Sequence, residues 1–147
     1  MVITVLLVGD HPIVSDKLQR LLQRHPDLEL IGSTESHDAN RLLQRRKVDV
    51  VVLDTQLPTM NGLKTADTMV AGTAAPPVIL LALHTDVRYV KASFGSGVAG
   101  YLLRESAYEE LPEAIRVVAG GNCYLSPHIA EAMRGEFAFR SCRHKDS

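Results

Sequence analysis

The sequence predicts a doubly wound α/β fold, in which a largely parallel sheet of five strands is covered by five helices and followed by a C-terminal helical extension. Short runs of β-forming apolar residues alternate with longer segments whose apolar residues recur at helical spacing. Two of the runs, residues 2–8 and 48–53, are apolar almost throughout, which is typical of central strands covered on both faces. With 147 residues, of which 46% are hydrophobic, the chain is long enough for one such domain.

The first half of the chain contains three strands and two helices. Apolar residues at helical spacing follow Pro12, and His25-Pro26-Asp27 ends that helix. Ser36 is the expected cap of the next helix, whose basic end suits the negative pole of the helix dipole. The expected strands are residues 2–8, 28–32 and 48–53, and the expected helices are residues 12–24 and 36–47.

The second half contains the other two strands and the remaining helices. Pro76-Pro77 precedes the fourth strand, and Gly95-Ser96-Gly97 separates a helix from the fifth strand. Gly120-Gly121 ends the fifth helix, and Ser126-Pro127 has the pattern of an N-cap with proline at the first helical position. The expected strands are residues 78–82 and 98–103, the expected helices are residues 62–71, 86–94 and 111–118, and the extension is residues 126–139.

The charge and cysteine content exclude several classes of function. The chain has 16 basic and 17 acidic residues, so it lacks the positive field that attracts DNA or an anionic membrane. No apolar run is long enough for a membrane span, and the first strand lacks the basic leader of a signal peptide. Cys123 and Cys142 are the only cysteines, and they support neither a disulfide framework nor a thiolate metal site. We therefore expect a cytoplasmic protein in a reducing compartment that does not bind DNA through this chain alone.

Two aspartates follow the first and third strands. In the flavodoxin-like strand order 2-1-3-4-5, the winding reverses between strands one and three, and ligands bind outside the carboxyl ends of strands at such a point. Asp10 and Asp54 occupy those two ends. Converging carboxylates attract a hard cation such as Mg²⁺, and the backbone carbonyl of Gln56 is a candidate third ligand. Taken singly, each aspartate is better explained as a helix cap or a turn residue.

Other ligand sites of α/β proteins are missing from the sequence. It has no glycine-rich nucleotide loop, no Walker lysine and no nucleophile elbow. Its 6 histidines are scattered without the spacing of metal ligands. We therefore predict no set of catalytic residues and do not expect an enzyme.

Three segments carry a more specific pattern: VLLVGDHP at residues 5–12, DVVVLD at residues 49–54 followed by Leu57-Pro58 and Asn61-Gly62, and GYLLR at residues 100–104. They resemble receiver domains of the response-regulator superfamily, in particular the subfamily with a LuxR-type helix-turn-helix. The likeness runs from about residue 2 to residue 127. It implies that a sensor histidine kinase passes a phosphoryl group to Asp54, with Mg²⁺ neutralising the developing charge. It also implies a homodimer that binds DNA through an output domain.

The resemblance is incomplete around the phosphoacceptor. Asp10 matches the family's direct metal ligand, but Gly9 stands where the family has a second acidic residue. Ala82 stands where the family has a serine or threonine that bonds the phosphoryl group, and Arg104 replaces its lysine. Tyr101 matches the family's switch aromatic, although a strand-edge tyrosine with a solvated hydroxyl explains it equally well. The departures predict weak Mg²⁺ binding and an atypical receiver that is phosphorylated slowly or is controlled without phosphorylation.

The resemblance places a receiver domain at residues 1–121 and a C-terminal helix with a linker or tail at residues 122–147. Those last residues are too few for a DNA-binding domain, so we expect the output domain to be absent from this chain. Two other functions stay open. One is a stand-alone protein-interaction adaptor, and the other is a phosphohydrolase with Asp54 as nucleophile. Against the phosphohydrolase, Gln56 stands where such enzymes place a second aspartate.

Overall fold

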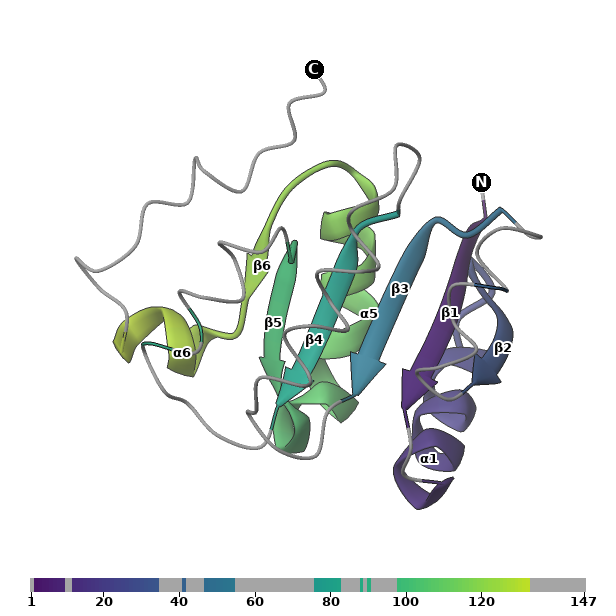
Figure 1. The fold of residues 1–147 in the computed structure, drawn as a ribbon, viewed down its shortest axis with the longest axis horizontal. Coiled ribbons are helices and arrows are strands. Elements are labelled where there is room, and N and C mark those ends of the chain that lie inside the picture. Colours follow the sequence, from purple (N-terminus) through teal and green to yellow (C-terminus); the bar gives the residue numbers. More distant parts are fainter. Residues whose placement is uncertain are drawn as a thin grey trace.

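A parallel sheet in the strand order β2-β1-β3-β4-β5-β6 forms the centre of the computed structural model (Figure 1). Its strands are β1 (Ile3–Gly9), β2 (Leu28–Thr34), β3 (Val50–Asp54), β4 (Val78–Ala82), β5 (Gly100–Leu103) and β6 (Tyr124–Leu125). The first five lie in the predicted order, because β1 pairs with β2 on one side and with β3 on the other. The flavodoxin-like α/β fold is therefore confirmed. The structure describes residues 2–9, 12–34, 41, 47–54, 76–82, 88, 90 and 98–132.

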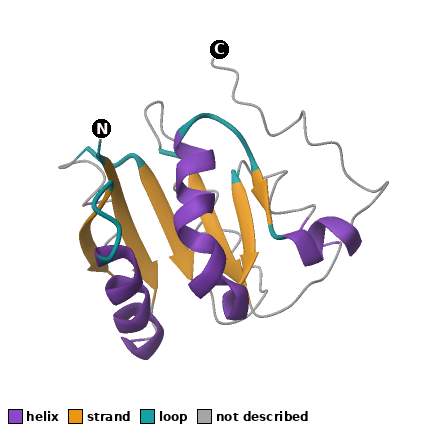
Figure 2. Cartoon of the chain, turned by 180° about the vertical axis from the view of Figure 1, so that it is seen from behind, coloured by secondary structure: helices purple, strands orange, loops and turns teal. Residues whose placement is uncertain are grey.

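Helices α1 (Pro12–Gln23) and α5 (Ala107–Ala119) cover one face of the sheet (Figure 2). A short 3-10 helix, η1 (Arg104–Ser106), precedes α5, and α6 (Pro127–Ala132) follows β6. In the described part of the chain, no helix is long and apolar enough to cross a membrane. The predicted helices at residues 36–47, 62–71 and 86–94 lie mostly outside the described residues. Of their described residues, Arg41, Arg88 and Val90 are helical, and Lys47, the predicted end of the second helix, is not.

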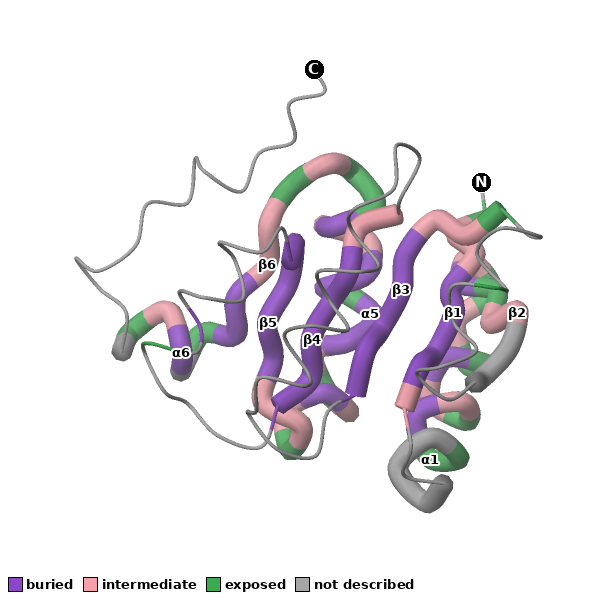
Figure 3. The backbone as a smooth tube through the Cα atoms, in the orientation of Figure 1, coloured by how far each residue is buried: buried purple, intermediate pink, exposed green. Residues whose placement is uncertain are grey.

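Apolar side chains form one cluster on each face of the sheet, because successive residues of a strand point to opposite faces. On one face, Val52 and Ile79 pack with Leu22 of α1 and with residues of α5. On the other face, Tyr101 of β5 lies in a cluster with Ile129 of α6. The central strands are buried along most of their length (Figure 3). Burial on both faces explains why the strand sequences are so continuously apolar.

The sixth strand, β6, is not predicted by the sequence. It has only two residues, so it shows no periodicity that could be recognised. It pairs in parallel with β5, with Tyr101 opposite Leu125. The sheet therefore gains a strand from the region predicted to be linker or tail, and β5 is not the edge of the sheet.

Helix α5 begins at Ala107, before the predicted start at residue 111, and contains Pro112. Pro112 has no N–H and cannot complete one hydrogen bond of the helix. The earlier start buries Ala107 and Leu111 against the sheet. We attribute the longer helix to this burial, which offsets the missing hydrogen bond.

Cys123 is disulfide-bonded, and the described part of the chain has no free cysteine. The only other cysteine of the sequence, Cys142, lies outside the described residues. The expectation of reduced cysteines is therefore wrong at Cys123. A count of cysteines does not reveal which of them lie within bonding reach in the fold.

Candidate functional site

The carboxyl ends of three strands bring Gly9, Asp54 and Arg104 to one edge of the sheet. Gly9 is the last residue of β1 and lies opposite Asp54, the last residue of β3, in the parallel register. Arg104 comes directly after β5. Parallel strands all end at the same edge, and ligands of open α/β sheets bind there. Ala82, the last residue of β4, lies at the same edge of the sheet, so these four residues form the described part of the site.

Arg104 holds one oxygen of the Asp54 carboxylate. Its Nε donates a hydrogen bond of 2.8 Å to Asp54 Oδ1, and its Nη2 lies 2.7 Å from the same oxygen. The Asp54 side chain is 2% exposed and the Arg104 side chain 13%. Because both groups are charged and water has little access to them, this is a strong charge-assisted contact. It fixes the direction of the carboxylate at the edge of the sheet.

Gly9 lies in close contact with Asp54, on the side of the other carboxylate oxygen. A β-carbon at position 9 would lie 3.1 Å from Asp54 Cβ and 3.7 Å from Asp54 Oδ2, which is buried. A carboxylate oxygen suits Mg²⁺, which prefers oxygen ligands. The other predicted ligands, Asp10 and Gln56, lie outside the described residues. Asp54 is therefore the predicted Mg²⁺ ligand that the structure describes, and no group of three His, Cys, Asp or Glu side chains gathers within the described residues.

We expect the substitution Gly9→Asp to make the stability of the domain depend on Mg²⁺. The new carboxylate would lie beside Asp54, so repulsion and the close approach to Asp54 Cβ should lower the free energy of unfolding by about 1–3 kcal/mol in a chelator. Mg²⁺ should recover most of this loss, because the cation would bind both carboxylates. Urea unfolding with and without Mg²⁺ measures the effect. Gly9→Asn is the control without the charge, and an equal response of both variants to Mg²⁺ would contradict this account.

Ala82 and Tyr101 belong to one apolar cluster on the face of the sheet opposite α5, and both are completely buried. β6 covers the side of β5, so the interpretation of Tyr101 as a strand-edge tyrosine with a solvated hydroxyl is wrong. Leu125 and Ile129 lie in the same cluster as Tyr101. Any reorientation of the Tyr101 ring therefore requires these neighbours to move.

A polar cluster beside β6 was not predicted from the sequence. Glu110 of α5 accepts hydrogen bonds at Oε1 from Tyr124 Oη (2.9 Å) and from Ser126 Oγ (2.8 Å). Burial, followed by the hydrogen bond to Glu110, raises the pKa of the Tyr124 hydroxyl to about 12. The one signal in the sequence was Ser126-Pro127, which indicates a helix start. The Ser126 carbonyl does accept a bond of 2.8 Å from Ala130 N at the start of α6, but the Ser126 hydroxyl bonds Glu110.

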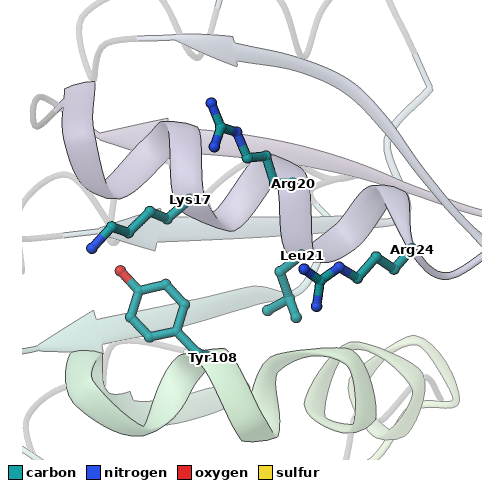
Figure 4. Close-up of a pocket in the computed structure, with 5 residues that line it drawn as sticks. All are labelled: Lys17, Arg20, Leu21, Arg24 and Tyr108. Atoms are coloured by element: carbon teal, nitrogen blue, oxygen red, sulfur yellow. The ribbon is translucent and has the colours of Figure 1, made fainter.

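A separate cavity of about 400 Å³ lies between α1 and α5 (Figure 4). It is lined by Lys17, Arg20, Leu21, Arg24 and Tyr108. Arg20 also pairs with Asp16 at 3.2 Å on the exposed side of α1. None of the predicted site residues lines this cavity, so it is not part of the Asp54 site.

Comparison with known proteins places these observations in a family context. A family model described as the response regulator receiver domain matches residues 5–116. The response regulator UvrY of Escherichia coli is 33% identical over 132 residues, which are 89% of this chain and 61% of UvrY. The transcriptional regulatory protein UhpA of Escherichia coli is 34% identical over 129 residues, which are 87% of this chain and 64% of UhpA. The chain thus spans less than two thirds of the length of these relatives.

A solved structure supports the same relationship. The two-component response regulator of the LuxR family from Aurantimonas sp. superposes with a TM-score of 0.83 at 28% sequence identity. The match covers 92% of this chain and 98% of that chain. Sequence and structure therefore agree on the same group of proteins.

Proposed function

This chain belongs to the response regulator receiver domain family, and on that premise we propose that Asp54 accepts a phosphoryl group and passes a signal to a transcription regulator. Of the relatives, UvrY is named a response regulator and UhpA a transcriptional regulatory protein, and the similar solved structure is a two-component response regulator of the LuxR family. Receiver domains of this family bind Mg²⁺ at the phosphorylation site. The assignment of Asp54 as the acceptor is the step beyond family membership.

The Arg104–Asp54 contact is the observation that supports this assignment. A nucleophilic carboxylate must be held in a fixed direction, and the two Arg104 nitrogens at 2.8 and 2.7 Å from Asp54 Oδ1 do so. The other carboxylate oxygen, Oδ2, lies on the side of Gly9. The guanidinium is also a permanent positive charge close to the oxygens of that group.

The transfer itself involves one bond formed and one broken. A carboxylate oxygen of Asp54 attacks phosphorus, and the bond between phosphorus and the donor breaks, with its electron pair leaving on the donor. Mg²⁺, when bound, neutralises negative charge on the transferred group. Asp54 would hold the cation together with Asp10 and the Gln56 carbonyl. The product is an aspartyl phosphate at the edge of the sheet.

Three departures from the family pattern indicate an atypical switch. Gly9 contributes no carboxylate to the cation site, so we infer weakened Mg²⁺ binding. Ala82 has no hydroxyl, and its methyl group is buried in the apolar cluster. Arg104 is a planar fork rather than a compact ammonium. We infer that phosphorylation is slow or that control is partly independent of it.

The proposed partners follow from the family. We infer a sensor histidine kinase as phosphodonor, a homodimer as the working form, and a cytoplasmic location. The relatives are longer than this chain, so we assign DNA binding to an output domain that this chain does not span. The net charge of -1 gives the present chain no basic field for DNA.

The test of the proposed function is incubation of the purified domain with Mg²⁺ and acetyl phosphate, followed by intact-mass measurement. We expect the added mass of one phosphoryl group in the wild type and none in Asp54→Asn, whose amide is not a nucleophile. An adduct of equal yield in Asp54→Asn would overturn the assignment.

The same experiment separates the two alternatives. A phosphohydrolase would release inorganic phosphate with many turnovers per domain, and the adduct would not persist. A protein-interaction adaptor would give neither an adduct nor released phosphate. We expect a persistent adduct with less than one turnover per domain over the time of labelling.

A further inference from the structure

Residues 124–132, here called the β6–α6 segment, are attached to β5 by backbone hydrogen bonds. Tyr124 N donates to Ala99 O at 3.0 Å, and Ser126 N donates to Tyr101 O at 3.2 Å. These bonds continue the parallel register in which Tyr101 lies opposite Leu125. The segment is therefore part of the sheet.

Glu110 fastens this segment on the α5 side. Its Oε1 accepts from Tyr124 Oη at 2.9 Å and from Ser126 Oγ at 2.8 Å. Ser126 is completely buried, so loss of its hydrogen bond leaves a polar group away from water, which is unfavourable by about 1–3 kcal/mol. Hydrogen bonds to a charged acceptor are also stronger than neutral ones. We call Glu110, Tyr124 and Ser126 the latch.

The opposite side of the segment is apolar. Leu125 and Ile129 join the cluster that contains Tyr101 and Ala82. Ile129 and Tyr101 are both completely buried. The segment is thus paired with β5 and held on both faces of the sheet, with the polar latch on the α5 face and the apolar contacts on the opposite face.

β5 connects this segment with the Asp54 site. Tyr101 lies in the middle of β5, and Arg104, which holds Asp54 Oδ1, directly follows the strand. A phosphoryl group on Asp54 converts the charged carboxylate into a neutral acyl group, so the bond of Arg104 to Oδ1 weakens and the guanidinium is drawn toward the charged phosphoryl oxygens instead. The strand that precedes Arg104 carries both the pairing with β6 and the Tyr101 ring. A shift of β5 therefore displaces the β6–α6 segment that is paired with it, because packed interfaces change between discrete arrangements.

We propose that the β6–α6 segment responds to the state of the Asp54 site. While Arg104 holds Asp54, the latch keeps the segment paired with β5. When Arg104 leaves that contact, the segment loosens from β5. In its use of phosphorylation as the trigger, the inference rests on the proposed function. The contacts that close the segment are independent of that function.

Hydrogen exchange at the amides of Tyr124 and Ser126 tests the inference, because these amides donate to Ala99, directly before β5, and to Tyr101 of β5. In the phosphorylated domain, exchange at residues 122–132 should be faster by roughly 5–150-fold, the usual range of coupling between two sites. Asp54→Asn treated with acetyl phosphate should show no change. Both samples contain a reductant, so that the disulfide at Cys123 does not hold the segment.

A second arm needs no phosphodonor. Arg104→Met, and Arg104→Lys as the milder variant if the first folds poorly, should raise exchange at residues 122–132 more than at β1. Arg20→Met, on the exposed side of α1, should leave exchange unchanged. If no adduct forms, the proposed function fails, and this arm alone decides the inference.

Reciprocity provides the third measurement. The double variant Tyr124→Phe with Ser126→Ala lacks both donors to Glu110, so it should bind the phosphoryl mimic beryllofluoride more tightly than the wild type does, because coupling between two sites is reciprocal. Unchanged exchange at residues 122–132 in a fully phosphorylated domain would overturn the inference. Unchanged exchange in the Arg104 variants of a domain that forms no adduct would overturn it equally.

Discussion

Replacement of Arg104 by methionine should lower the free energy of unfolding by about 3–5 kcal/mol, the usual effect of removing one partner of a buried ion pair. The Asp54 side chain is only 2% exposed, and Arg104 supplies two nitrogens to its Oδ1. Methionine has a similar length but no charge, so the carboxylate would stay buried without this partner. Urea unfolding at neutral pH measures the loss.

A double-mutant cycle separates the lost ion pair from other effects of the substitution. Asp54→Asn removes the charge that Arg104 compensates, so Arg104→Met should have a much smaller effect in the Asp54→Asn background. Arg20→Met is the matched control, because Arg20 forms an exposed pair with Asp16 and its loss should change stability by less than about 1 kcal/mol. Equal effects of Arg104→Met in both backgrounds would contradict the role assigned to the ion pair.

Replacement of Ile129 by alanine should lower the free energy of unfolding by about 2–5 kcal/mol, although the residue lies in the region predicted to be linker or tail. Ile129 is completely buried and shares the apolar cluster of Tyr101 and Leu80. Truncation removes buried methyl groups and leaves a cavity beside Tyr101. A single cooperative transition that moves to lower urea would indicate that the β6–α6 segment unfolds with the domain.

Val2→Ala is the control for this prediction, since Val2 is 49% exposed and lies outside the core. It should change the free energy of unfolding by less than about 0.5 kcal/mol. A similarly small effect of Ile129→Ala would mean that the segment is a linker that rests on the domain without stabilising it.

The order of the first five strands could be predicted from the sequence because each strand has a long enough apolar run. β4 was predicted at its observed bounds, Val78–Ala82, because Pro76-Pro77 marks its start and its residues form a continuous apolar run. The run is continuous because β4 is buried on both faces of the sheet. β6 could not be predicted, because two residues carry no pattern and their pairing depends on β5. The start of α5 was predicted at residue 111, whereas the helix begins at Ala107, which is buried against the sheet.

The candidate site was partly predictable for a geometric reason. Once the strand order is known, residues at the carboxyl ends of β1, β3 and β5 must share one edge, which places Gly9, Asp54 and Arg104 together. The bond of Arg104 to a single oxygen of Asp54 could not be predicted, because it depends on side-chain conformation. Asp10 and Gln56 lie outside the described residues, so their roles stay predictions.

The latch could not be predicted for a different reason. Glu110 and Ser126 are separated along the chain and meet only because β6 pairs with β5. In the sequence, Ser126 before Pro127 has the pattern of a helix cap, and Glu110 lies just before the predicted helix at residues 111–118. Their contact is a consequence of the unpredicted strand.

The most direct test of the central claim is chemical mapping of the phosphoryl group. Borohydride reduces an aspartyl phosphate to homoserine, so reduction after treatment with Mg²⁺ and acetyl phosphate marks the acceptor permanently, and peptide mass spectrometry then locates it. We predict homoserine at position 54 in the wild type and none in Asp54→Asn. Homoserine at another aspartate, or none at any position in a domain that has gained the mass of a phosphoryl group, would contradict the assignment of Asp54 as the acceptor.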